Sequence, residues 1–126
     1  TPSCPPAYVG AKADIGNSAV AKGCEVLGEV KNSVLSYNTQ VGEGAVVSYS
    51  VLMPGAVVES GAVVQYAIVG ENCRIGRDAQ VGAPPETAQD PDDWGVAVLG
   101  PGTVIGDGEI VSAKTLLDRH HGEVKA

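Results

Sequence analysis

A 17-residue repeat in the middle of the chain constrains its fold more than any other feature. Three consecutive copies begin at Ser33, Ser50 and Ala67, and they read SVLSYNTQVGEGAVV, SVLMPGAVVESGAVV and AIVGENCRIGRDAQV. A fixed period of this size is typical of a solenoid, in which each copy buries its apolar face only by stacking on its neighbours. The repeat therefore predicts a stack of similar coils.

Large aliphatic residues recur within each copy at steps of six, six and five, and they form three columns. The columns are Val20, Leu35, Leu52 and Val69; Val26, Val41, Val58 and Ile75; and Val47, Val64 and Val81. Three such residues per copy suit a triangular coil of three short strands, each pointing one large side chain inward. An amphipathic helix would need apolar residues at i, i+3, i+4 and i+7, which these steps do not provide.

Small residues two positions before the aliphatics support the same register, because alternate residues of a strand share a face. This set includes Cys24, Thr39, Ala56 and Cys73, then Ala45, Ala62 and Ala79, then Ser33 and Ser50. The residue before many of them is Gly, Asn or Asp: Gly23, Asn38, Gly55, Asn72, Gly44, Gly61 and Asp78. These types tolerate positive φ, so we predict tight corners at those positions.

The pattern continues on both sides of the three copies and predicts about six coils. One coil is two residues short near Leu27, and Glu109 stands where the other coils carry a small residue, which indicates a frayed or capping last coil. The expected organisation is a Pro-rich linker (1–8), a β-helix domain (9–117) with a loop ejected from one corner (82–97), and a C-terminal tail (118–126).

The charge and the cysteine count exclude several classes of function. A net charge of −7 disfavours binding to nucleic acid or to an anionic membrane surface. There is no apolar run of the length that spans a bilayer, and no signal-like segment follows Thr1. Three cysteines form no disulfide framework, so we expect a reducing, cytoplasmic compartment.

The cysteines and histidines have structural explanations. Cys24 and Cys73 share one inward column three coils apart, roughly 14 Å at the usual strand spacing, which is too far for a disulfide. We interpret both as small buried residues, and Cys4 as a free thiol in the linker. His120 and His121 follow the last coil, where they cannot supply three zinc ligands or a general base in a cleft, so we expect a solvated tail.

Two features remain as candidates for binding. Arg74 and Arg77 flank Ile75 on one outward face and could bind a phosphorylated effector, since arginine gives bidentate contacts to phosphate. Solvated charge or an ion pair between subunits is the alternative. Trp94, the sole tryptophan, is expected to anchor the acidic, Pro-rich loop on a coil or on a neighbouring subunit.

The six-residue step resembles the hexapeptide repeat of left-handed parallel β-helices, and the handedness is an implication of that resemblance. A more specific resemblance rests on Pro5 to Val9, Gly23 to Val30, Asn32 to Leu35, Ser50 to Gly55 and Trp94 to Gly100. In this order, and with the shortened coil, the segments resemble the C-terminal β-helix domain of bacterial glucose-1-phosphate adenylyltransferase over nearly the whole chain. The fold class is therefore expected to be an all-β, left-handed parallel β-helix.

The resemblance also implies a function. In that family ATP and glucose 1-phosphate give ADP-glucose and pyrophosphate for glycogen synthesis, and the catalytic domain, with its ATP and Mg²⁺ sites, lies N-terminal to the β-helix. The chain is then expected to hold no cofactor, no metal and no catalytic residue, and to be inactive by itself. Its expected partners are its own catalytic domain, like subunits in a homo- or hetero-oligomer, and a phosphorylated metabolite at Arg74 and Arg77.

Two alternatives remain open at this point. A stand-alone hexapeptide acyltransferase would need a basic or His-containing cleft for coenzyme A, and the ejected loop carries no His, Lys or Arg. A pure oligomerisation module would need its end coils capped or paired, because they expose unpaired strand edges.

Overall fold

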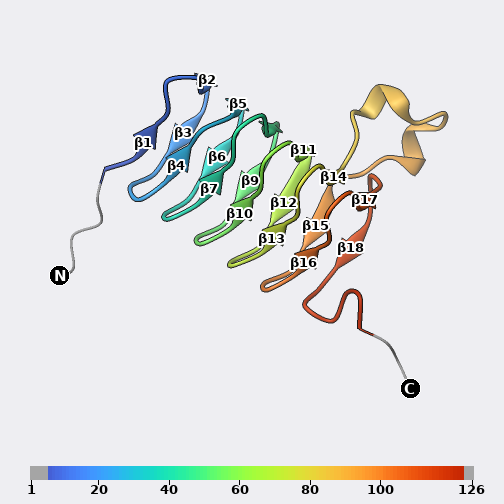
Figure 1. Ribbon diagram of the computed structural model, residues 1–126. Coiled ribbons are helices and arrows are strands. Elements are labelled where there is room, and N and C mark those ends of the chain that lie inside the picture. Colours follow the sequence, from blue (N-terminus) through green and yellow to red (C-terminus); the bar gives the residue numbers. More distant parts are fainter. Residues whose placement is uncertain (1–5, 124–126) are drawn as a thin grey trace.

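The computed structural model describes residues 6–123 and shows a three-sided parallel β-solenoid of six coils (Figure 1). Each coil contributes one short strand to each of three six-stranded parallel sheets. The all-β solenoid with about six coils and one projecting loop is therefore confirmed. Among the described residues, no helix has the length and apolar character needed to cross a membrane.

The three sheets, which we call A, B and C, have the following strands. Sheet A holds β1 (Tyr8–Val9), β4 (Glu25–Val26), β7 (Gln40–Val41), β10 (Val57–Val58), β13 (Arg74–Ile75) and β16 (Val104–Ile105). Sheet B holds β2 (Asp14–Gly16), β5 (Glu29–Lys31), β8 (Val46–Ser48), β11 (Val63–Gln65), β14 (Gln80–Val81) and β17 (Ile110–Val111). Sheet C holds β3 (Ala19–Val20), β6 (Val34–Leu35), β9 (Val51–Leu52), β12 (Ala67–Val69), β15 (Ala97–Leu99) and β18 (Leu116–Leu117).

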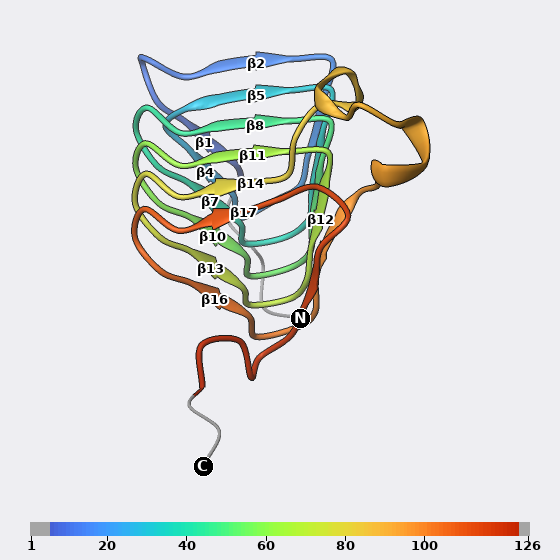
Figure 2. The ribbon, with the colours of Figure 1, turned by 90° about the vertical axis from the view of Figure 1, so that its right-hand side faces the viewer.

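The strand register reproduces the sequence period directly. Val41 pairs with Val58 in the next coil, seventeen residues on. Val26 pairs with Val41 at a separation of fifteen, so the second coil is the short one. Figure 2 shows the resulting stack, in which each strand lies beside its equivalent in the neighbouring coils.

The predicted columns form the core. The inward aliphatics of the inner coils are almost completely buried, as are the small residues two positions before them. The buried hydroxyls form their own ladder: Ser33 Oγ accepts from Ser50 N at 3.1 Å, and Ser50 Oγ accepts from Ala67 N at 3.2 Å. Within the described residues every buried side-chain nitrogen or oxygen has a partner, so the core contains no unexplained polar group.

The corners have the backbone conformation that the sequence predicts. All seven Gly, Asn and Asp residues singled out above have positive φ, between 56° at Asn72 and 79° at Gly23. A third corner column was missed, and it consists of Asn17, Asn32, Tyr49, Tyr66 and, in the last coil, Lys114. The two tyrosines both have φ of 49°, and their rings stack with centroids 4.8 Å apart.

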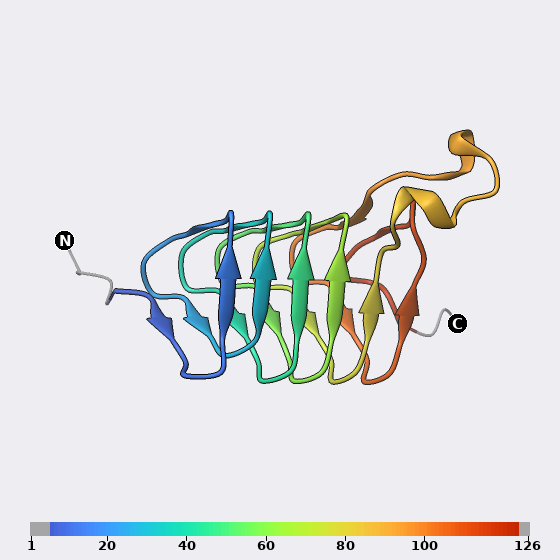
Figure 3. The same cartoon turned by 90° about the horizontal axis from the view of Figure 1, so that it is seen from above.

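The ejected loop leaves sheet B after β14 and returns at β15. It contains two short 3₁₀ turns, η1 (Pro85–Thr87) and η2 (Pro91–Asp93), and projects from the stack near its C-terminal end (Figure 3). Trp94 packs edge-on against Tyr66, with ring centroids 5.6 Å apart, and its Nε1 donates to Ala83 O at 2.7 Å. The expected anchor is therefore a contact with the fourth coil.

Candidate functional site

The shortened second coil produces a hollow at the corner between sheets A and B. The first coil turns this corner through Ala11 and Lys12, and the third turns it through Glu43 and Gly44, but the second passes directly from Leu27 to Gly28. The missing residues leave a cavity of about 620 Å³, which we call the corner hollow. It is lined by Lys12 and Asp14 of the first coil, by 27–29 of the second and by 43–46 of the third.

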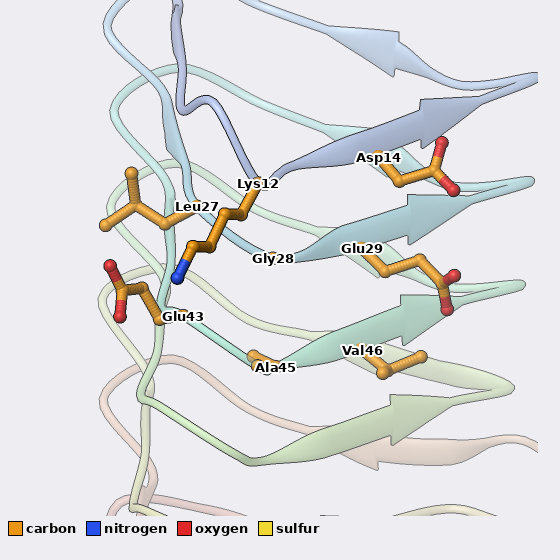
Figure 4. A pocket seen from close by; sticks show the side chains of 9 residues that line it. Lys12, Asp14, Leu27, Gly28, Glu29, Glu43, Ala45 and Val46 are labelled. Carbon is orange, nitrogen blue, oxygen red and sulfur yellow. The ribbon is translucent and has the colours of Figure 1, made fainter.

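Charged side chains surround the corner hollow. Figure 4 shows Lys12 extending across it from the first coil, with Glu43 on the far side and Asp14 and Glu29 on the adjoining strands. Asp14 is already paired, since its Oδ1 lies 2.8 Å from Lys31 Nζ. Sequence reasoning identified the two-residue shortening but not the hollow that it creates.

Arg74 and Arg77, the predicted effector residues, lie on neighbouring parts of the fifth coil but face different partners. Arg74 stands on β13, and its Nη2 lies 2.6 Å from Glu59 Oε1. Arg77 is at the corner after β13, where its backbone N donates to Asp107 Oδ1 and its side chain lines a groove of about 200 Å³ on sheet A. Glu25 and Glu59 line the same groove.

Sheet C carries a continuous apolar strip on its outer face. The outward residue of each strand pairs with the outward residue of the next, and all six are aliphatic: Ala19, Val34, Val51, Ile68, Val98 and Leu116. Val34, Ile68 and Leu116 are exposed large apolar residues. The equivalent positions on sheets A and B include charged residues such as Glu25, Arg74 and Glu29.

This apolar strip was also missed by the sequence analysis, although its signal was present. Each of its residues immediately precedes an inward aliphatic of one column, such as Leu35, Leu52 or Val69. A six-strand aliphatic face is a surface suited to packing against another protein surface.

The last coil is closed by the tail. Glu109 takes the inward position that Ala45, Ala62 and Ala79 fill in earlier coils, and its carboxylate accepts from Gly106 N at 3.0 Å and contacts His121 Nε2. Partial burial raises the pKa of Glu109, but the Gly106 N–H and His121 outweigh this effect, so the pKa of the carboxyl lies below its ordinary value. His121 is therefore a capping residue, whereas His120 is exposed and contacts Glu123.

The two inward cysteines are residues of the core. Cys24 and Cys73 are buried and unpaired, and burial raises the pKa of the Cys73 thiol, which disfavours the reactive thiolate. Cys4 lies outside the described residues. Between residues 6 and 123, no group of three or more His, Cys, Asp or Glu side chains is arranged to hold a metal ion.

Comparisons with known proteins relate this geometry to a family. A family model described as GlmU-like, C-terminal hexapeptide matches residues 6–97. Glucose-1-phosphate adenylyltransferase of Clostridioides difficile is 49% identical over 57 residues, which are 45% of this chain and 15% of the relative. The enzyme of the same name from Desulfitobacterium hafniense is 40% identical over 53 residues, or 42% of this chain and 13% of the relative.

A solved structure supports the fold independently. The acetyltransferase domain of PglB from Neisseria gonorrhoeae superposes with a TM-score of 0.72 and 20% identity, over 87% of this chain and 51% of that one. At this identity the likeness shows the solenoid fold alone. The chain spans about 15% of the length of the first curated relative and about half of this structural neighbour.

Proposed function

Because the chain belongs to the GlmU-like, C-terminal hexapeptide family, we propose that it serves as the C-terminal assembly and regulatory domain of a glucose-1-phosphate adenylyltransferase. The observation that carries the proposal is the combination of that sequence likeness with the apolar strip on sheet C. The reaction itself, ATP plus glucose 1-phosphate giving ADP-glucose and pyrophosphate, belongs to a separate catalytic domain with its own Mg²⁺ and ATP sites. The likeness to an acetyltransferase domain gives no additional support to the alternative, a stand-alone acyltransferase, because the ejected loop lacks the basic residues that would bind coenzyme A.

The catalytic domain of the same protein is the occupant that best suits the apolar strip. Six strands about 4.8 Å apart and about three residues wide give a strip of roughly 24 by 10 Å. This is well below the roughly 800 Å² per partner that a stable complex between separate proteins needs. A domain joined through the same chain is held at high effective concentration, so a small apolar contact is sufficient to keep it docked.

Activity measurements test the proposal. We expect no ADP-glucose from the isolated chain with ATP, glucose 1-phosphate and Mg²⁺, whereas a chimaera in which this chain replaces the matching region of the Clostridioides difficile relative is expected to turn over. Ile68→Asp in the chimaera should weaken the domain contact, seen as faster proteolysis between the domains, and Glu25→Asp on sheet A serves as the control. ADP-glucose formation by the isolated chain would overturn the proposal.

Arg74 and Arg77 remain the proposed site for a phosphorylated effector. Arg74 is held by Glu59, so a phosphate group would have to replace that carboxylate, while Arg77 carries no ion pair within the described residues. Two guanidinium groups three residues apart could then hold one phosphate from two sides. In the chimaera, Arg77→Ala should reduce activation by a phosphorylated sugar, and Lys22→Ala, on an earlier coil, should leave it unchanged.

A further inference from the structure

The backbone ladder at the corner between sheets A and B has a missing rung. In the later coils each corner N–H donates to a carbonyl of the preceding coil: Gly61 N to Glu43 O at 3.1 Å, Asp78 N to Ser60 O at 3.2 Å and Gly108 N to Arg77 O at 2.8 Å. Gly44 is the next corner residue in this column. Its acceptor would be the corner that the second coil lacks, and within residues 6–123 its N–H has no backbone acceptor.

The missing rung opens into the corner hollow. The hollow lies between the first and third coils, so a group that enters it occupies the place of the absent corner (Figure 4). Any acceptor placed there can take the Gly44 N–H in the same way that Glu43 O takes the Gly61 N–H. A peptide carbonyl has the geometry of the group that fills this place elsewhere in the ladder.

The charges around the hollow favour a cationic side chain on that peptide. Glu29 and Glu43 both line it, and neither forms an ion pair within the described residues, whereas Asp14 is neutralised by Lys31. Lys12 is the only basic residue lining the hollow, and it extends from the first coil on a flexible stem. An anionic guest would face these carboxylates, while an arginine or lysine that displaces Lys12 would lie beside Glu43, with Glu29 adding negative charge from β5 (Figure 4).

We propose that the corner hollow binds an extended peptide segment that carries an arginine or a lysine. A carbonyl of the segment accepts from the Gly44 N–H and restores the rung, and its basic side chain takes the place of Lys12 beside Glu43. This site is on the corner between sheets A and B, separate from the apolar strip of sheet C, and it does not depend on the proposed function.

Amide NMR on the 126-residue chain tests the proposal with a defined probe. Titration with acetyl-Gly-Arg-Gly-amide to about 10 mM, which covers the millimolar affinity of such a small ligand, should shift the Gly44 and Gly28 amides saturably and slow Gly44 hydrogen exchange. Acetyl-Gly-Gln-Gly-amide should shift them at least several-fold less. Without peptide, the Gly44 amide should exchange faster than that of Gly61.

Two variants separate the site from a non-specific effect. Insertion of Glu-Gly between Leu27 and Gly28 restores the 17-residue period, fills the hollow and should abolish the response while keeping or raising the melting temperature. Glu29→Gln combined with Glu43→Gln keeps the hollow open and should weaken binding of the arginine peptide about tenfold. The proposal is overturned if no saturable shift occurs, if both peptides act alike, or if neither the insertion nor the double substitution reduces the response.

Discussion

At the scale of single residues, position within a column decides the backbone conformation and the packing that each residue must adopt. Tyr49 and Tyr66 adopt positive φ, a conformation that is unfavourable for bulky residues and that Asn17 and Asn32 adopt in the same column. The stack between the two rings, extended by Trp94, stabilises the tyrosines in this conformation. Propensity alone points to Gly or Asn here, so the sequence could not predict this corner.

Val58 provides the sharpest test of the inward register. Its side chain is 1% exposed, so Val58→Asp places a carboxylate in an aliphatic column with no partner. We expect a loss of roughly 3–5 kcal/mol in unfolding free energy, seen as a fall of about 10 °C or more in melting temperature. Val57→Asp, on the outward side of the same strand, is the control and should cost far less. Equal effects of the two would contradict the register.

Glu109 predicts a pH dependence of stability. A carboxyl whose pKa is lowered in the folded state contributes stability above its unfolded pKa, and loses it as the pH falls through the folded pKa. The melting temperature of the wild type should therefore fall more steeply below about pH 4.5 than that of Glu109→Gln. Glu71→Gln, at an exposed corner, is the control. Parallel curves for wild type and Glu109→Gln would show that the capping contact contributes nothing.

At the scale of elements, the strands and two of the three corner columns were predictable from the sequence, but the corner hollow was not. The inward columns, the short coil and the loop follow from spacing, because burial requires one residue type at fixed intervals, as Val41 and Val58 show. The strip on sheet C depends on which outward residues become neighbours across strands. The corner hollow depends on what surrounds two absent residues, and it becomes visible only when the coils are stacked.

We expect Trp94 to be the main residue that holds the ejected loop against the aromatic pair of Tyr49 and Tyr66. Trp94→Ala removes the edge contact to Tyr66 and the hydrogen bond to Ala83 O, which together should contribute on the order of 1–2 kcal/mol to loop closure. We expect faster cleavage within 83–96 in limited proteolysis, with little change in the melting temperature of the coils. Trp94→Phe should retain part of the protection. Unchanged cleavage in Trp94→Ala would mean that Lys114, which donates to Asp92 O, holds the loop.

At the scale of the whole molecule, one face is left apolar from the first coil to the last. In the isolated chain the strip on sheet C has no covering domain, so we expect weak, concentration-dependent self-association at high micromolar concentration. Light scattering should show Ile68→Asp returning the chain to a monomer, while Gln80→Asp on sheet B leaves the association unchanged. If the wild type stays monomeric throughout this concentration range, the apolar strip does not mediate self-association.

The substitution of glutamate for alanine at 109 has a consequence for how such proteins change length. A solenoid grows by duplication of a coil, and each copy needs an inward small residue to accept the next one. A copy inserted between the coils that carry Ala45, Ala62 and Ala79 would find alanines at that position on both sides and add about 4.8 Å of length. A copy added after it would have to accommodate a carboxylate inside the core. Duplications are therefore expected to accumulate upstream of this residue. In related chains of different length, the coil with the inward glutamate should remain the last one.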